Sequence, residues 1–150
     1  MGSDHAAAAE RRALGAYVKL MRAAESVTAH LSIGLREVRL TTSQIGVLEA
    51  LYHLGPMCQG DLSAKLLKSN ANLTVVVGNL ERRGLVSRCP DPEDRRRVIV
   101  TLTANGHRLI SKVFPAHAAR ITRRFSVLDT SEQELLAALC RRLGLGDERR

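Results

Sequence analysis

The segment 80–106, "LERRGLVSRCPDPEDRRRVIVTLTANG", decides the fold that we predict for this chain of 150 residues. It opens at the end of a helical pattern, which Gly84 closes. Two short β-favouring runs follow, "LVSRC" and "RVIVTL", and "PDPEDRR" joins them. In the second run Val98, Val100 and Leu102 recur with the two-residue period of a half-buried strand. We therefore predict a β-hairpin with a long, charged tip that points into solvent.

Helical patterns precede this hairpin. Apolar residues recur every three or four positions from Glu10 to about Leu35, which predicts a long amphipathic first helix. Thr41 and Gln44 match a capping box and predict the start of a second helix. A short third helix is expected from about Gln59 to Leu67, and a fourth from Ser69 or Asn70 to Arg83. The chain up to the hairpin is therefore predicted to be α-helical.

Helical patterns also follow the hairpin. Thr103 is expected to cap a fifth helix, in which Pro115 should produce a kink or a division. Thr130 and Gln133 match a second capping box and predict a sixth helix. We expect that helix to bury four leucines, Leu135, Leu136, Leu139 and Leu143. The predicted fold class is mainly α with a small β-hairpin.

Composition limits the architecture and the partners. A chain of this length with 45% hydrophobic residues is expected to form one domain over residues 1–150. Its net charge of +8 favours a polyanionic partner. No apolar run approaches the roughly 20 residues that span a bilayer, and the N-terminus lacks the apolar centre of a signal peptide. We expect a soluble, cytoplasmic protein that does not bind membranes.

Patterns typical of catalysis or metal binding are missing from the sequence. Cys58, Cys89 and Cys140 form no CxxC pair, and the five histidines form no HExxH set. The sequence also has no Gly-rich phosphate loop and no nucleophile elbow. We expect no enzyme activity, no cofactor and no metal.

The third and fourth helices, with the hairpin behind them, predict a winged helix-turn-helix over residues 41–103. Leu73, Val76, Val77 and Leu80 form one apolar stripe on the fourth helix, so the opposite face points outward. That outward face is small, polar and uncharged except at its end, as expected for a helix that approaches base edges in a major groove. The candidate reading residues are Ser69, Asn70, Ala71, Asn72, Thr74, Val75 and Asn79. The alternative is an exposed helix with a purely structural role.

Basic residues flank this outward face. Between Lys65 and Arg97 there are eight basic and four acidic residues, so this segment carries half of the net charge. Cations beside a reading helix are suited to DNA phosphates, which position a protein without specifying sequence. The candidate phosphate contacts are Lys65, Lys68, Arg82, Arg83 and Arg88.

The segment 80–106 resembles the MarR family of bacterial and archaeal transcriptional regulators. The family's wing carries D-x-R followed by V-x-V-x-L-T-x-x-G, and here Asp94 and Arg96 precede "VIVTLTANG". The likeness extends to "LTTSQIGVLEAL" and "DLSAKL" earlier in the chain. One departure is "VVVGNLERRG", where Gly78 and Asn79 replace an acid and a base that are common in the family.

The resemblance implies a homodimer built from helices in residues 10–36 and 104–145, with both winged motifs on one palindromic operator. It also implies a role for the wing: Arg96 enters the minor groove, and Asp94 holds the tip and orients it. A narrow A·T-rich minor groove attracts a guanidinium. Arg95 and Arg97 would then reach backbone phosphates.

The expected function is therefore sequence-specific binding of double-stranded DNA by a transcriptional regulator. We expect repression in preference to activation. Members of the family often bind small phenolic effectors between the dimer helices and the winged domain. The candidate residues for such a pocket are Tyr17, His30, His53 and Met57, for which simple packing is the alternative. The alternative function is nonspecific, architectural binding of nucleic acid with the same fold.

Overall fold

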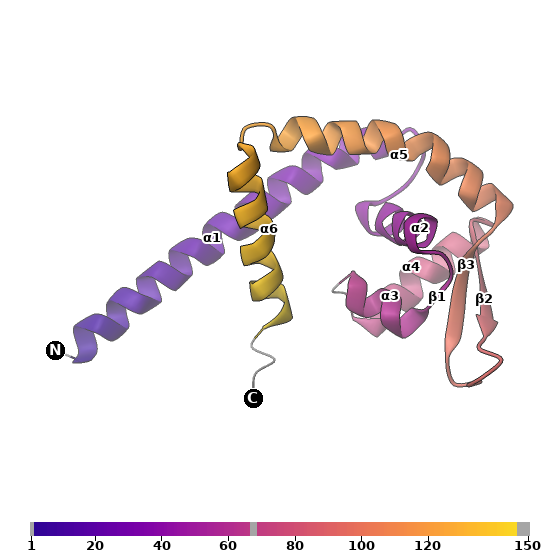
Figure 1. Cartoon of the computed structure of the whole chain (residues 1–150), viewed down its shortest axis with the longest axis horizontal. Coiled ribbons are helices and arrows are strands. Elements are labelled where there is room, and N and C mark those ends of the chain that lie inside the picture. Colours follow the sequence, from indigo (N-terminus) through magenta and orange to yellow (C-terminus); the bar gives the residue numbers. More distant parts are fainter. Residues whose placement is uncertain (1, 67–68, 147–150) are drawn as a thin grey trace.

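The computed structural model describes residues 2–66 and 69–146. The chain forms helices and three short strands in the order shown in Figure 1. Their bounds are α1 (Gly2–Leu35), α2 (Thr42–Leu54), β1 (Met57–Cys58), α3 (Gln59–Lys65), α4 (Asn70–Arg82), β2 (Val86–Pro90), β3 (Val98–Leu102), α5 (Ala104–Phe125) and α6 (Thr130–Leu145). The predicted class, mainly α with a β-hairpin wing, is confirmed.

Side-chain caps start three of the helices where the sequence predicts them. Thr41 accepts a hydrogen bond from the Gln44 N–H (3.1 Å), and the Gln44 side chain accepts one from the Thr41 N–H (3.0 Å). The Ser69 hydroxyl caps α4 by accepting from the Asn72 N–H, and the Thr103 hydroxyl caps α5 by accepting from the Gly106 N–H. At the other end of α4, Gly84 adopts a φ of 69°, a conformation that glycine tolerates best. The limits of the reading helix are therefore encoded locally.

Other predicted boundaries were wrong. The capping box of α6 is formed by Asp129 and Glu132, one residue before the predicted pair Thr130 and Gln133. A carboxylate at the cap accepts the free N–H groups of the first turn, so Asp129 takes the place expected for Thr130. Helix α1 also starts earlier than predicted, at Gly2.

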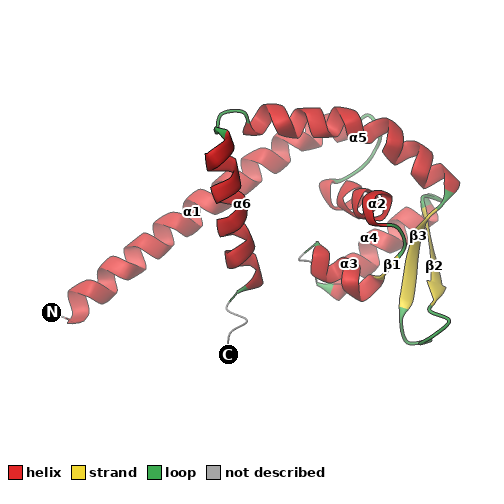
Figure 2. Cartoon of the chain, viewed as in Figure 1, coloured by secondary structure: helices red, strands yellow, loops and turns green. Residues whose placement is uncertain are grey.

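The three strands form one antiparallel sheet in the order β1-β3-β2. In the predicted hairpin, Val86 pairs with Leu102 at one end and Pro90 with Val98 at the other. The sequence analysis missed β1, in which Met57 pairs with Val100. A strand of two residues is too short to show an alternating pattern. Figure 2 shows the loop between β2 and β3 extending beyond the helices.

The hydrophobic core lies in the winged part of the chain. Leu48 and Leu51 of α2, Leu80 of α4 and Val100 of β3 are among the residues that form it, together with Ile110 from the start of α5. Because α2 supports α4 through this core, the outward face of α4 is presented on a rigid base.

Most of α1, the end of α5 and the whole of α6 extend away from that core (Figure 1). Pro115 lies inside α5 without dividing it, and Figure 1 shows one continuous helix that changes direction along its length. The expectation that α6 buries Leu135, Leu136, Leu139 and Leu143 was wrong for the single chain, in which all four are exposed. The reason is that α6 stands apart from the core, so the described chain leaves its apolar stripe largely uncovered.

Candidate nucleic-acid interface

The outward face of α4 is open to solvent. Ala71, Asn72, Thr74 and Val75 are exposed, and the Val75 side chain is 61% exposed in spite of being apolar. Leu73, Val77 and Leu80 on the opposite face are fully buried. Of the predicted reading residues, Ser69, Asn70, Ala71, Asn72, Thr74 and Val75 are thus accessible, while Asn79 is half-buried.

Hydrogen bonds fix the start of this surface. The Ser69 hydroxyl accepts from the Asn72 N–H (3.2 Å), while the Thr74 hydroxyl donates to the Asn70 carbonyl (2.8 Å). The Gln59 amide of α3 donates to the Thr74 hydroxyl (2.7 Å). Thr74 is exposed and has its hydroxyl engaged, which leaves the methyl group for apolar contacts. The sequence analysis missed Gln59, because only the packing of α3 on α4 brings it to this surface.

The tip of the wing is organised by aspartates. The Asp94 carboxylate accepts from the backbone N–H of Arg96 (3.1 Å) and from its Nε (3.2 Å). Asp91 accepts from the Glu93 N–H (3.0 Å), and the Asp91 N–H donates to the Arg97 carbonyl (2.8 Å). The side chain of Arg96 remains 92% exposed. The tip is thus a structured loop that presents one guanidinium to solvent.

Arg97 faces the base of the wing. Its Nη2 donates to the Cys58 Sγ (3.1 Å) and lies 3.4 Å from Asp61 Oδ2, and its Nε lies 3.9 Å from Asp91 Oδ2. The hydrogen bond to the sulfur of Cys58 raises the pKa of Arg97 above its ordinary value. These contacts link the wing to α3, while half of the Arg97 side chain stays exposed, so its contact with a phosphate remains a prediction.

The other candidate phosphate contacts differ in how free they are. Arg88 donates to Glu81 from Nη2 (3.0 Å) and Nε (3.3 Å), and this contact lowers the pKa of the Glu81 carboxyl. Arg88 is therefore already paired with an acid. Lys65 and Arg82 are exposed, and the Arg82 guanidinium donates a hydrogen bond to the side-chain oxygen of Asn79. Lys68 lies outside the described residues.

The candidate effector residues are not gathered in one place. Tyr17 and His30 are exposed on α1, and Met57 packs against the core from β1. His53 lies in a ring cluster with Tyr52 and Phe114, at 5.1 Å and 4.7 Å between ring centroids. This cluster joins α2 to α5, the helix that links the winged part to the C-terminal helix.

An apolar groove of about 510 Å³ runs between α1, the end of α5 and α6. Leu20, Val27, Phe125 and Leu136 are among the residues that line it. A second apolar stripe lies on α1, formed by Leu14, Tyr17, Val18 and Met21, all of them exposed. Contiguous exposed apolar surface of this kind marks an interaction site.

Within residues 2–66 and 69–146, no helix is long and apolar enough to cross a membrane. The same residues contain no cluster of three or more His, Cys, Asp or Glu side chains suited to a metal ion.

The chain is similar to known DNA-binding transcriptional regulators, as the arrangement of α3, α4 and the wing suggests. The model of the MarR family matches residues 40–98. The chain is 37% identical to YkoM, an HTH-type transcriptional regulator of Bacillus subtilis, over 89% of this chain and 87% of that one. It is 33% identical to the B. subtilis regulator MhqR, over 89% and 92% of the two chains. Among solved structures, it is similar to Bordetella bronchiseptica BpsR, whose DNA binding is regulated by 6-hydroxynicotinic acid. The TM-score is 0.77 at 29% identity, over 85% of this chain and 91% of that one.

Proposed function

The chain belongs to the MarR family of transcriptional regulators, and we propose that it is a homodimeric repressor that recognises a palindromic site in double-stranded DNA. In this proposal α4 enters the major groove and the wing reaches the adjacent minor groove. A repressor of this kind acts by occupying a promoter. In this proposal the protein is cytoplasmic.

The observation that carries the proposal is the outward face of α4. Asn72 is exposed and its side-chain amide makes no hydrogen bond within the described part of the chain, so it is free to pair with an adenine edge. Val75 and the Thr74 methyl group are suited to thymine methyl groups. Small, uncharged side chains let the helix approach the bases closely. A solvated structural helix would normally carry Glu or Lys on such a face.

The wing supports the same function. Arg96 is exposed at the tip, and Asp94 restrains its direction. Because the narrow minor groove of A·T-rich DNA has a strong negative potential, a restrained guanidinium is favoured there. Arg95, also exposed at the tip, is suited to a backbone phosphate.

The dimer is supported by the apolar stripes that the single chain leaves open. Leu135, Leu139 and Leu143 lie on one side of α6, and the stripe that includes Tyr17 lies on α1. A second copy that covers both stripes would bury them and set two α4 helices in fixed positions. Two readers one helical turn apart, about 34–36 Å, would match an inverted repeat. In this proposal Tyr17 belongs to the dimer interface instead of an effector pocket.

A small-molecule effector is proposed from the similarity to BpsR, whose DNA binding is regulated by 6-hydroxynicotinic acid. The ring cluster of His53, Tyr52 and Phe114 joins α2 to α5, where an aromatic ligand could change the angle between reader and dimer helices. A ligand can act only if its affinity differs between the two states of the protein.

The experiment that tests the function is a competition titration. A duplex selected by the protein from a random pool is labelled, and unlabelled selected or unrelated duplex is added at fixed salt. A sequence-specific regulator should prefer its site by about 10³ or more. A preference close to one would support architectural binding instead.

A further inference from the structure

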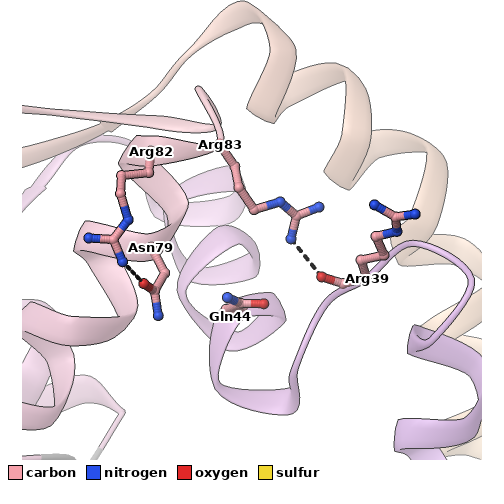
Figure 3. Close-up of a pocket in the computed structure, with 5 residues that line it drawn as sticks. All are labelled: Arg39, Gln44, Asn79, Arg82 and Arg83. Atoms are coloured by element: carbon pink, nitrogen blue, oxygen red, sulfur yellow. Dashed lines mark hydrogen bonds between the residues drawn. The ribbon is translucent and has the colours of Figure 1, made fainter.

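Three arginines meet in a pocket between the start of α2 and the end of α4. The pocket has a volume of about 470 Å³ (Figure 3). It is lined by Arg39, Gln44, Asn79, Arg82 and Arg83. No carboxylate lines it, and none of the three arginines forms an ion pair with an acid in the described part of the chain. The pocket therefore concentrates positive charge that the described chain does not neutralise.

The polar groups of the pocket are mainly donors. Arg83 donates to the backbone carbonyls of Arg39 (2.6 Å) and Val38 (3.2 Å), which are neutral acceptors and leave its charge uncompensated. Gln44 uses its side-chain oxygen for the Thr41 N–H, so its NH₂ group remains available. Figure 3 shows Gln44 between Asn79 and Arg39, with Arg83 reaching from the end of α4 toward Arg39. Guanidinium and amide donors without a competing acid are suited to a phosphate oxyanion.

The position of the pocket indicates where that phosphate comes from. Asn79 and Arg82 follow Val75 by four and seven residues, so they continue the outward face of α4. A duplex that lies against this face passes over the pocket. The pocket also lies at the N-terminal end of α2, where the helix dipole favours an anion.

We propose that the pocket holds one phosphodiester group of the DNA strand that borders the groove entered by α4. This rests on the proposed function and extends the DNA contact to Arg39 and Gln44. Arg39 lies before the winged region that the sequence predicts, in the turn that follows α1. Through it, the DNA backbone would contact the segment that joins the reading domain to α1.

The chain offers a matched pair of variants. Arg39 has a φ of 54°, which glycine adopts more readily, so Arg39→Gly removes the guanidinium while keeping the turn. Arg36→Gln removes one charge from the same turn; Arg36 is exposed and does not line the pocket. Thermal melting monitored by circular dichroism should show Arg39→Gly at least as stable as the wild type.

The first measurement is the salt dependence of DNA binding. A plot of the logarithm of the binding constant against the logarithm of the salt concentration has a negative slope. Each lost phosphate contact should make this slope less steep by about 0.9 per protomer. We expect this loss for Arg39→Gly, equally for selected and unrelated duplexes, and no loss for Arg36→Gln. On an Arg82→Gln background, Arg39→Gly should have a smaller effect, because both residues contact the same phosphate. Equal slopes for Arg39→Gly and Arg36→Gln would overturn the proposal.

The second measurement locates the phosphate. Duplexes carry a single neutral methylphosphonate at successive positions. At one position in each half-site, the substitution should weaken binding by the wild type more than binding by Arg39→Gly, in which only Arg82, Arg83 and Gln44 remain to contact that phosphate. Two results together would overturn the DNA assignment. No methylphosphonate position would affect the wild type and Arg39→Gly differently, and inorganic phosphate at constant ionic strength would inhibit DNA binding by the wild type alone. The pocket would then bind free phosphate. If the wild type binds no duplex at all, the proposed function itself fails.

Discussion

The carboxylate of Asp94 accepts two hydrogen bonds from Arg96, one from the backbone N–H at 3.1 Å and one from Nε at 3.2 Å. The carboxylate thus restrains the direction of the arginine side chain, although that side chain stays 92% exposed. A restrained arginine loses less conformational entropy when it enters a groove than a free one.

Arg96→Ala should therefore weaken binding of the selected duplex by about 1–3 kcal/mol. Fluorescence anisotropy at fixed salt measures this loss. Asp94→Asn should weaken binding less, because the guanidinium remains but is held less firmly. Wild-type affinity for Arg96→Ala would exclude the wing from DNA recognition.

A close contact with the backbone explains why the segment that joins β3 to α5 has a glycine at position 106. A Cβ at this position would collide with the carbonyl oxygen of Leu85, which already accepts the Thr103 N–H at 3.1 Å. Gly106→Ala should lower the free energy of unfolding by about 1–3 kcal/mol, the usual cost of overpacking. Urea denaturation checks this value.

Gly15→Ala is the matched control for that variant. A Cβ at Gly15 meets nothing within 4 Å, and the residue lies inside α1. Because alanine favours helix more than glycine by up to about 1 kcal/mol, this variant should be neutral or stabilising. Similar losses in both variants would contradict the steric explanation of Gly106.

The dimer proposal predicts that charge on the α6 stripe separates the protomers. Leu135 is 60% exposed in the single chain, so Leu135→Glu should leave the protomer folded while it weakens association by about 2 kcal/mol or more. Leu54→Glu is the control, since Leu54 is 52% exposed at the end of α2, away from both stripes. Analytical ultracentrifugation distinguishes them, and an unchanged dimer in Leu135→Glu would exclude this surface as the interface.

The burial of His117 predicts that stability depends on pH. Its side chain is buried, at 5% exposure, and its Nδ1 has no hydrogen-bond partner within the described residues. Burial lowers the pKa of His117 below its ordinary value of 6.5; Glu49 raises this pKa and Arg120 lowers it. The unfolded chain therefore binds the proton more tightly than the folded one, and the free energy of unfolding should fall as pH decreases through about 6.5.

Urea denaturation at pH 7.5 and pH 5.5 measures this dependence. His117→Gln removes the titrating group, so the difference in stability between the two pH values should be smaller in the variant. The comparison is between the two pH-dependent differences in the free energy of unfolding. A loss of packing in the variant lowers stability at both pH values and therefore does not change its difference. An unchanged difference would show that His117 is not the source.

Local signals in the sequence predicted much of the fold. Thr41, Ser69 and Thr103 start helices because their side chains satisfy nearby N–H groups, an interaction that depends only on neighbours in the chain. The alternation from Val98 to Leu102 likewise encodes β3. The outward face of α4 followed from the helical period once its buried stripe was known.

Contacts between distant segments could not be predicted. Arg39 and Arg83 are 44 residues apart, and only the packing of α4 beside the turn after α1 brings them together. The contact between Arg97 and Cys58 depends in the same way on the fold around α3. Exposure of the α6 leucines was mispredicted because periodicity reveals an apolar face without revealing which chain covers it.

The most direct test of the central claim, that the outward face of α4 reads bases, is selection of duplexes from a random pool by the wild type and by Asn72→Ala. The wild type should select an inverted repeat with half-sites about one helical turn apart. Asn72→Ala should relax the preference at the same position of both half-sites and leave the rest of the site intact. An identical site for the two proteins, or no common site for the wild type, would contradict the claim.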